Sequence, residues 1–237
     1  MPLILKTLAV LPICVLQGIY VKKTIIRLPE PDGERIGSYG KGKKLLSLGI
    51  LGDSAAAGVG VKVQKDALLG QLLASLQDQY TIDYQLHATT GHTTDQLIER
   101  IKKLPIQRID VVITSIGVND VTQLKSPKKW LQQQKQLYRL IQEKFNPQLI
   151  VIAGVPPMHV FPALPNPLRW LFGSYAKSMN QALDVLIKSH KNMYCMHYDI
   201  EYYQKMNLNM AEDGFHPSKE IYGYWAKQIT TIIVKMI

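Results

Sequence analysis

The sequence predicts a three-layer α/β/α sandwich built on a central parallel sheet of about five strands. Apolar runs of strand length alternate with longer segments in which apolar residues recur at helical spacing. Most of the runs are continuously hydrophobic, which is typical of strands that are covered on both faces. Helices that connect parallel strands through right-handed crossovers provide those two covers.

The composition fits one globular domain with an N-terminal extension. At 237 residues and 46% hydrophobic content, the chain is long enough to bury a large core. Only two cysteines occur, Cys14 and Cys195, so neither a disulfide framework nor a structural zinc site is expected. We divide the chain into an N-terminal segment, residues 1–43, and a main domain, residues 44–237.

The N-terminal segment begins with an apolar stretch, residues 3–21, that is interrupted by Lys6, Thr7 and Gln17. Its uninterrupted part is too short to cross a bilayer comfortably, and it is followed by a poor signal-peptide cleavage site. We therefore expect an uncleaved helix that associates with a membrane, followed by a basic linker that ends at residue 43. The alternative is a helix packed on the main domain.

Positive charge is concentrated in the same segment. The chain has a formal net charge of +10, and residues 1–44 hold eight basic residues against three acidic ones. This imbalance favours contact of residues 1–27 with an anionic membrane surface, and no nucleic-acid-binding motif accompanies it. Lys22, Lys23 and Arg27 follow the apolar stretch, so if this stretch inserted into a membrane, the positive-inside rule would keep the main domain in the cytoplasm, which is the expected location. An exported or periplasmic location is the alternative.

The first half of the main domain is predicted to hold three strands separated by helices. The first and third strands are continuously apolar, whereas the second alternates apolar and polar side chains. Asp66 is placed to cap the first helix, in which leucines recur at helical spacing. The predicted strands are residues 45–51, 81–87 and 109–116, and the helices are residues 68–76 and a segment that ends near Lys103.

The second half continues the same alternation. Ser126 followed by Pro127 is a strong helix start, because serine caps and proline suits the first helical position. A proline-rich apolar loop, residues 156–170, suits the wall of an apolar pocket or a cover over the core. The predicted helices are residues 127–145, 168–188 and a terminal helix opened by Pro217 and Ser218, and the strands are residues 149–155 and 193–197.

Residues that can perform acyl transfer follow the strand ends. The carboxyl ends of parallel strands share one edge of a sheet, so side chains distant in sequence can meet there. Ser54 is the expected nucleophile, His216 the base that removes its proton, and Asp213 the carboxylate that orients the imidazole. The backbone N–H groups of Ser54 and Gly91, with the side-chain amide of Asn119, are expected to stabilise a developing oxyanion.

These residues resemble, in order, the four sequence blocks of the SGNH hydrolases, the GDSL esterase and lipase superfamily. The resemblance covers about residues 44–237 and implies an SGNH/flavodoxin-like fold, a serine nucleophile, carboxylic ester substrates and no metal or other cofactor. Ala55 stands where the family usually has leucine, and we expect this departure to affect packing only. The matching blocks are Gly52-Asp53-Ser54, Gly91, Gly117-Val118-Asn119-Asp120, and Asp213 with His216.

Apolar acyl esters are the favoured substrates. The proline-rich loop and the membrane-prone N-terminus both favour a small or lipid-like ester with an apolar acyl group. Asp53 is expected to orient its loop and not to act chemically. The expected pocket residues are His92, His159, Val160, Phe161 and Phe215.

Three other functions are considered. An acyltransferase uses the same residues and passes the acyl group to an alcohol in place of water. A nucleotide-binding module is suggested by Gly52, Gly58 and Gly60 between a strand and a helix, but neither G-x-G-x-x-G nor G-K-[ST] is present. A membrane-tethered scaffold without activity is disfavoured because every residue type that acyl transfer needs is present.

Overall fold

The computed structural model describes residues 3–196 and 198–237. The parts of our predictions that concern residues 1, 2 and 197 lie outside the described residues. The helices are α1 Leu3–Thr24, α2 Ser54–Ala57, α3 Leu68–Leu76, α4 Thr94–Lys102, α5 Val118–Thr122, α6 Pro127–Phe145, α7 Leu168–Ile187, α8 Ile200–Lys205 and α9 Lys219–Met236, with 3₁₀ turns η1 Gln64–Asp66 and η2 Met158–Val160. The strands are β1 Ile36–Tyr39, β2 Lys44–Gly52, β3 Tyr80–Ala88, β4 Val111–Ser115, β5 Leu149–Ala153 and β6 Met193–Met196.

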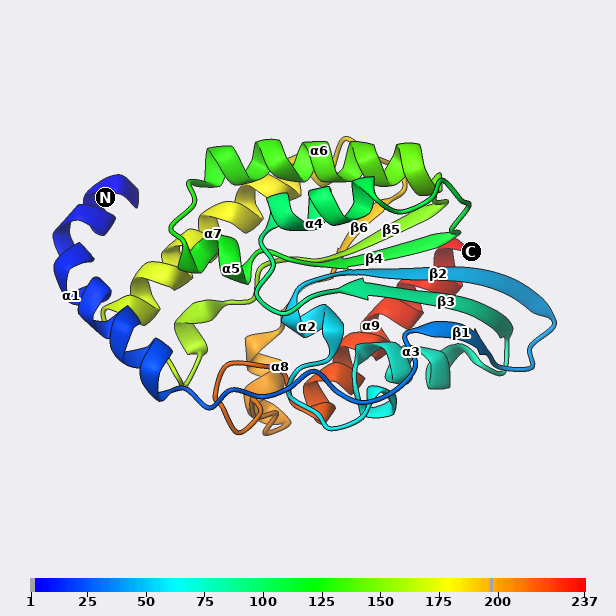
Figure 1. The fold of residues 1–237 in the computed structure, drawn as a ribbon, viewed down its shortest axis with the longest axis horizontal. Coiled ribbons are helices and arrows are strands. Elements are labelled where there is room, and N and C mark those ends of the chain that lie inside the picture. Colours follow the sequence, from blue (N-terminus) through cyan, green and yellow to red (C-terminus); the bar gives the residue numbers. More distant parts are fainter. Residues whose placement is uncertain (1–2, 197) are drawn as a thin grey trace.

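The strands form one sheet in the order β1-β3-β2-β4-β5-β6 (Figure 1). β2 to β6 run parallel; Ile50 at the centre pairs with Leu86 on one side and Ile113 on the other. The predicted parallel sheet of about five strands is thus confirmed. The sixth strand, β1, pairs antiparallel with β3, although the sequence analysis placed residues 36–39 in the linker.

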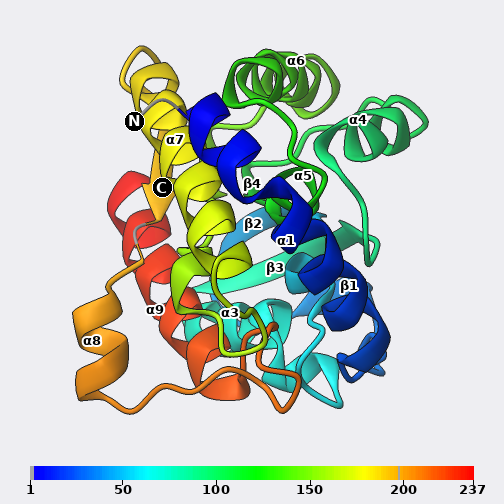
Figure 2. The same ribbon diagram turned by 90° about the vertical axis from the view of Figure 1, so that its left-hand side faces the viewer.

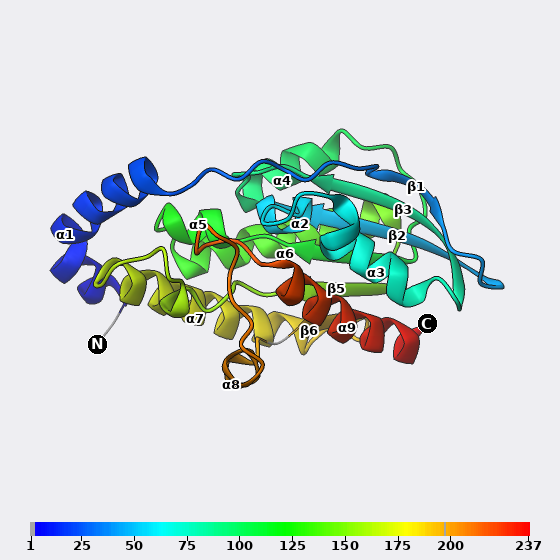
Figure 3. The same cartoon turned by 90° about the horizontal axis from the view of Figure 1, so that it is seen from below.

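Helices cover both faces of the sheet, as the continuous hydrophobicity of the strands predicts (Figures 1 and 3). On β4, Val112 packs in the same cluster as buried residues of α4, α6 and α7. Its neighbours Val111 and Ile113 belong to the opposite cluster, which includes buried residues of α3 and α9. Successive strand residues point to opposite faces, so this strand supplies both cores of the sandwich.

Two of the three predicted helix starts agree with the structure. Ser126 accepts a hydrogen bond from the Lys129 N–H at the start of α6, and Ser218 accepts one from the Ile221 N–H at the start of α9. Asp66 does not cap α3. It lies in the turn η1, and its carboxylate pairs with Lys219 at 3.0 Å, while the helix begins after the extended residue Ala67.

Helix α1 lies beyond the end of the sheet where the parallel strands terminate, packed against α7 (Figures 1 and 2). It is long and apolar enough to cross a membrane by length and composition. Cys14 is buried against the main core, whereas Leu8 and Leu16 are 62% and 70% exposed. The helix is therefore packed on the domain, as one of our alternatives expected, and membrane association stays a prediction.

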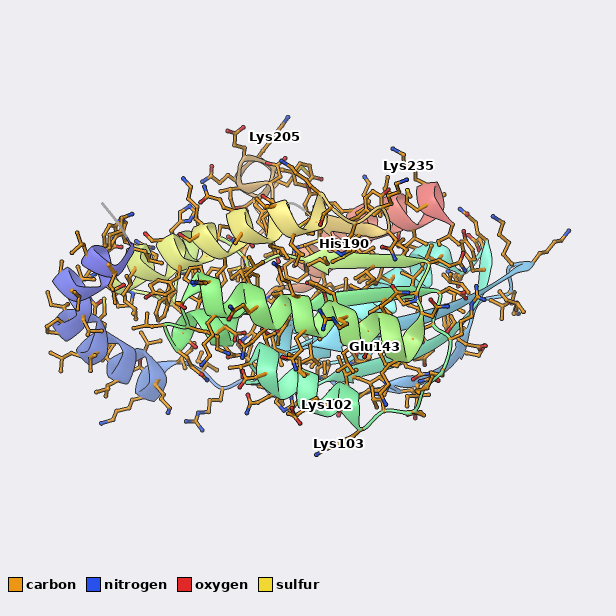
Figure 4. All side chains as sticks on the ribbon, turned by 90° about the horizontal axis from the view of Figure 1, so that it is seen from above. Lys102, Lys103, Glu143, His190, Lys205 and Lys235 are labelled. Carbon is orange, nitrogen blue, oxygen red and sulfur yellow. The ribbon has the colours of Figure 1, made fainter. Side chains whose placement is uncertain are left out.

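The outer faces of the other helices are charged. Lys102 on α4, Lys205 on α8 and Lys235 on α9 project away from the body of the molecule (Figure 4). Glu143 and His190 are likewise exposed near the ends of α6 and α7. Such a surface is ordinary for a soluble domain, which sets α1 apart from the other helices.

Candidate active site

Ser54 is the first residue of α2 and follows the C-terminal end of β2. Asp53 caps this short helix by accepting a hydrogen bond of 3.1 Å from the Ala55 N–H. Gly52 permits the close packing of the turn, because a Cβ there would lie 2.0 Å from the Ser115 carbonyl oxygen on β4. The serine is consequently held, half-buried, at the edge of the sheet where the strands end.

Two side chains from the loop between α8 and α9 complete a hydrogen-bonded chain with Ser54. The Nε2 atom of His216 lies 2.9 Å from the Ser54 hydroxyl, and its Nδ1 atom lies 2.5 Å from Asp213 Oδ2. A proton on Nδ1 that is directed at the carboxylate leaves Nε2 able to accept the serine proton. The structure thus brings Ser54 together with two residues that follow it by more than 150 positions in the sequence.

The electrostatics of Asp213 favour its ionised form. Burial raises the pKa of its carboxyl, but three hydrogen bonds outweigh this effect and hold the pKa below its ordinary value. They come from the His216 ring and from the backbone N–H groups of His216 and Phe215, the latter two at 3.0 and 2.9 Å from Oδ1. A carboxylate that stays ionised remains an acceptor for the imidazole N–H.

The loop that carries His216 is held tightly against the loop that follows α2. A Cβ on Gly60 would lie 2.1 Å from the Pro217 carbonyl oxygen, so only glycine allows this approach. The buried Tyr222 of α9 adds a hydrogen bond of 2.7 Å to the Val59 carbonyl. Packing between these loops accounts for Gly60, and the close approach at the end of β2 accounts for Gly52. Neither glycine needs a bound phosphate to explain it.

Asn119 lies in the first turn of α5, just after β4. Its side-chain amide donates to the His92 carbonyl at 2.9 Å, which fixes the direction of the amide plane. The next residue, Asp120, is fully buried and accepts hydrogen bonds from the backbone and the hydroxyl of Thr94 at 3.0 and 2.8 Å. Lys125 Nζ lies 2.5 Å from the same carboxylate, so a buried ion pair holds the α5 loop in place.

Gly91 lies in the exposed loop between β3 and α4, with a φ of +84°. Among the described residues, no acceptor is hydrogen-bonded to the backbone N–H of Gly91 or to that of Ser54. Asn119 has a second amide hydrogen beyond the one given to His92. Three donors in this region are thus available to a bound oxygen atom.

An apolar pocket opens beside Ser54 and His216. Two polar groups on its aromatic walls donate hydrogen bonds within the protein. The Tyr198 hydroxyl donates to the Gly154 carbonyl at 2.8 Å, and the Trp225 N–H donates to the Tyr203 hydroxyl at 2.6 Å. The aromatic walls therefore expose few free polar atoms to a bound apolar group. The lining residues include Ala55, Val118, Pro156, Pro157, Val160, Phe161, Tyr198, Ile200, Tyr203, Met210, Phe215, Ile221 and Trp225.

Three of the five expected pocket residues line this pocket: Val160, Phe161 and Phe215. The two histidines do not. His159 lines a separate groove along α7, and His92 belongs to the loop whose carbonyl orients Asn119. Burial and the nearby Arg100 lower the pKa of His92 below its ordinary value, which favours a neutral ring.

The comparisons with known proteins agree with this geometry. The sequence model of the GDSL-like lipase/acylhydrolase family matches residues 50–224. The chain belongs to this family. It is therefore a carboxylic ester hydrolase of the GDSL type, and the predicted resemblance is confirmed. No curated protein sequence matches the chain.

Solved structures of GDSL family members and esterases share the fold at low sequence identity. A lipolytic G-D-S-L family protein from Veillonella parvula is 13% identical with a TM-score of 0.64, covering 81% of this chain and 99% of that one. The M. smegmatis aryl esterase is 14% identical with a TM-score of 0.59, covering 82% and 100%. An acetyl xylan esterase, AlAXEase, is 16% identical with a TM-score of 0.57, covering 78% and 98%.

One wall of the pocket in this GDSL family member was not predicted from the sequence. Ile200 and Tyr203 come from α8, a helix too short to show a helical repeat of apolar residues in the sequence. Trp225 comes from the middle of α9. A signal was present in the clustering of aromatic residues between positions 198 and 225. Several of these rings pack on one another, Tyr198 against Trp225 among them.

Asp53 is a buried acid beside Ser54 with only one firmly hydrogen-bonded carboxylate oxygen, Oδ1. Burial raises the pKa of this carboxyl to about 7, more than the Ala55 N–H and the nearby His216 lower it. In the unfolded chain the group titrates near pH 4. Between these values the folded state binds more protons, so the free energy of unfolding falls as the pH rises toward 7.

We expect Asp53→Asn to remove this pH dependence. The asparagine side-chain oxygen can still accept from the Ala55 N–H, while the buried charge is absent. Relative to wild type, the variant should gain stability between about pH 4 and pH 7, by up to ~4 kcal/mol, and the gain should then level off. Urea unfolding across this pH range measures it; a constant difference between the two proteins would contradict the expectation.

Proposed function

We propose that this GDSL family member hydrolyses carboxylic esters with apolar, including lipid-like, acyl groups through a covalent acyl-enzyme on Ser54. The hydrogen bond of 2.9 Å between Ser54 Oγ and His216 Nε2 is the observation that carries the proposal. A serine hydroxyl is a weak nucleophile until a neighbouring base accepts its proton. The ionised Asp213 behind the imidazole stabilises the positive ring that this transfer produces.

In the first half-reaction, Ser54 Oγ attacks the ester carbonyl carbon as its proton moves to His216 Nε2. The tetrahedral intermediate collapses when the carbon–oxygen bond to the alcohol breaks and His216 gives its proton to the departing oxygen. Water then enters, loses a proton to His216 and attacks the acyl-enzyme. The carboxylic acid leaves, and the proton returns to Ser54.

Three donors are assigned to the negative oxygen of the tetrahedral intermediates. They are the backbone N–H groups of Ser54 and Gly91 and the second amide hydrogen of Asn119. The hydrogen bond from Asn119 to the His92 carbonyl supports this assignment, because it holds the amide in one orientation before substrate binds. One such donor typically contributes about 3–4 kcal/mol to transition-state stabilisation.

The apolar pocket is assigned to the acyl group. Its walls begin at Ala55 and Val118 beside the nucleophile and continue to Tyr203 and Trp225. The Tyr198 hydroxyl and the Trp225 N–H on these walls are already hydrogen-bonded, so a buried sugar hydroxyl would find few partners there, and an unpaired buried hydroxyl is costly. This favours an apolar acyl chain over a polar one.

Location at a membrane is part of the proposal. The apolar helix α1 carries Lys22 and Lys23 in its last turn, and Arg27 follows it; all three are exposed. Cationic groups next to an apolar segment favour the anionic cytoplasmic leaflet. We assign the catalytic domain to the cytoplasmic side.

The test of this function is hydrolysis by the full chain of a p-nitrophenyl ester series, from acetate to palmitate. We expect measurable hydrolysis with an optimum at an acyl chain longer than acetate. No activity on any ester, or a clear preference for acetylated carbohydrate, would contradict the proposal. Repeating the reaction with an added alcohol acceptor separates a hydrolase from an acyltransferase, because a transferase forms the new ester in preference to the free acid.

A further inference from the structure

The outward side of α1 is apolar from Ile4 to Tyr20. Leu8 and Leu16 are the centre of this surface, which we call the α1 outer face. Its exposed large side chains are Ile4, Leu5, Leu8, Ile13, Val15, Leu16, Ile19 and Tyr20. Exposed apolar residues scattered singly are normal, but eight on one side of one helix mark an interaction surface.

Three polar side chains of α1, those of Lys6, Thr7 and Gln17, face the protein. Thr7 Oγ1 lies 3.1 Å from the Tyr175 hydroxyl on α7, and Lys6 Nζ lies 5.0 Å from the centre of the Trp170 ring. Gln17 makes two hydrogen bonds, donating to the Asn166 carbonyl at 2.6 Å and accepting from the Leu168 N–H at 3.0 Å. These contacts fasten the helix to the start of α7.

A helix that left the domain to cross the bilayer would lose these partners. Lys6, Thr7 and Gln17 would then lie inside the bilayer as part of a helix of 22 residues, and unpaired polar groups are costly in hydrocarbon. Cys14, only 4% exposed, would also leave the core. The contacts therefore favour a helix that stays on the domain and turns its outer face to a partner.

The charge around the α1 outer face selects the partner. Residues 1–29 contain no acidic residue, and their basic residues are Lys6, Lys22, Lys23 and Arg27. Exposed apolar side chains with cations beside them and no anion fit an anionic lipid surface, where the apolar groups enter the headgroup region and the cations meet phosphate. A second copy of this chain would bring cation against cation.

The α1 outer face and the pocket mouth lie at the same end of the molecule. The segment from Pro156 to Pro167 walls the pocket with Val160 and Phe161, and its Asn166 binds Gln17 of α1. Helix α1 lies beyond the end of the sheet that carries Ser54 (Figures 1 and 2). A surface bound to the outer face is thus a near neighbour of the catalytic edge.

We propose that α1 lies along an anionic bilayer while it remains packed on α7, and that this contact holds the pocket mouth beside the lipid. The substrate is then an ester embedded in the membrane, whose acyl chain passes from the bilayer into the pocket. The docking surface rests on α1 alone, whereas the substrate class rests on the ester hydrolysis proposed above.

The test compares Leu8→Asp/Leu16→Asp with a matched control, Leu45→Asp/Ile106→Asp, in the full chain. The control residues are 80% and 78% exposed and lie at the opposite end of the sheet. Sedimentation with phosphatidylcholine vesicles, with and without phosphatidylglycerol, measures binding. We expect the α1 variant to lose about tenfold or more in affinity for the anionic vesicles, while the control binds as wild type does. Equal binding by all three proteins would overturn the docking surface.

Activity gives the second measurement. A water-soluble short-chain p-nitrophenyl ester should be hydrolysed equally by the three proteins, whereas a long-chain ester dissolved in the vesicles should be hydrolysed about tenfold more slowly by the α1 variant. An unchanged rate on the vesicle-borne ester would overturn the proposed source of substrate. If wild type binds vesicles through α1 but cleaves neither ester, the proposed function fails and the docking surface stands.

Two further outcomes identify another partner or arrangement. Wild type that stays in the vesicle pellet after alkaline carbonate extraction would show that α1 spans the bilayer, which overturns the proposal. A dimer in vesicle-free solution that Leu8→Asp/Leu16→Asp converts to a monomer, with vesicle binding unchanged, would assign the α1 outer face to a second copy. Release by carbonate and a monomeric wild type are the expected results.

Discussion

Ser54→Ala should lower kcat for ester hydrolysis by about 10⁴-fold or more. Alanine removes the hydroxyl oxygen on which we propose that the acyl-enzyme forms, and its methyl group at the start of α2 cannot act as a nucleophile. His216 would lose a single hydrogen bond of 2.9 Å, and the pocket would keep its shape. The variant should therefore still bind substrate and should fail at the covalent step.

The measurement is steady-state kinetics on the p-nitrophenyl ester that gives the highest wild-type rate, together with labelling by an alkyl fluorophosphonate. Wild type should be labelled stoichiometrically and Ser54→Ala not at all. Ser178→Ala is the matched control, because its hydroxyl lies on α7 and donates only within that helix, and it should act within about twofold of wild type. Activity in Ser54→Ala equal to that of wild type would show that another residue is the nucleophile.

The sequence predicted the sheet and the main helices because their signals are long and local. The runs at residues 45–51 and 149–155 are apolar enough to identify buried strands alone. β1 gave no such signal: Ile36–Tyr39 contains glycine and serine, is exposed throughout, and is a strand only because β3 lies beside it. β1 forms because the folded chain places it beside β3, and the hydrophobicity of its own residues does not predict this pairing.

The candidate site likewise contains residues that local sequence predicts and residues that it does not. Ser54, Asn119 and His216 lie in short motifs at strand ends or before the last helix, so pattern and position in the chain are enough to predict them. The pocket depends on which side chains converge from distant elements. The side chain of His159 lines the groove along α7, whereas that of Tyr203 lines the pocket. The residues next to them in the sequence do not determine where either side chain points.

The composition of helix α1 does not determine which of its sides packs on the protein. Lys6, Thr7 and Gln17 are spaced so that they share one side of the helix, but the sequence does not say whether that side meets water or protein. The structure packs it against α7 and leaves the apolar side outward. This arrangement suits the helix that lies along a membrane in our proposal.

The second large effect is expected at Asp213, where asparagine should lower kcat about 10⁴-fold while the fold is kept. The asparagine oxygen can accept the backbone N–H groups of Phe215 and His216, which hold the loop. Its NH₂ group would then face His216 Nδ1 and donate to it. The imidazole would carry its proton on Nε2, where it points at Ser54 and can no longer accept the hydroxyl proton.

Kinetics and thermal unfolding of Asp213→Asn should be measured on the same preparation, with Asp213→Ala beside it. A tautomer effect predicts that asparagine retains a melting temperature near that of wild type and nonetheless loses activity about as severely as alanine does. Fluorophosphonate labelling of Ser54 should slow in parallel with kcat, because both reactions need the same proton transfer. If Asp213→Asn keeps most of its activity, the carboxylate only shapes the loop, and another group must orient His216. Because hydrogen bonds outweigh burial and hold the pKa of Asp213 below its ordinary value, the wild-type carboxylate should support the imidazole over the whole pH range in which the esterase is active.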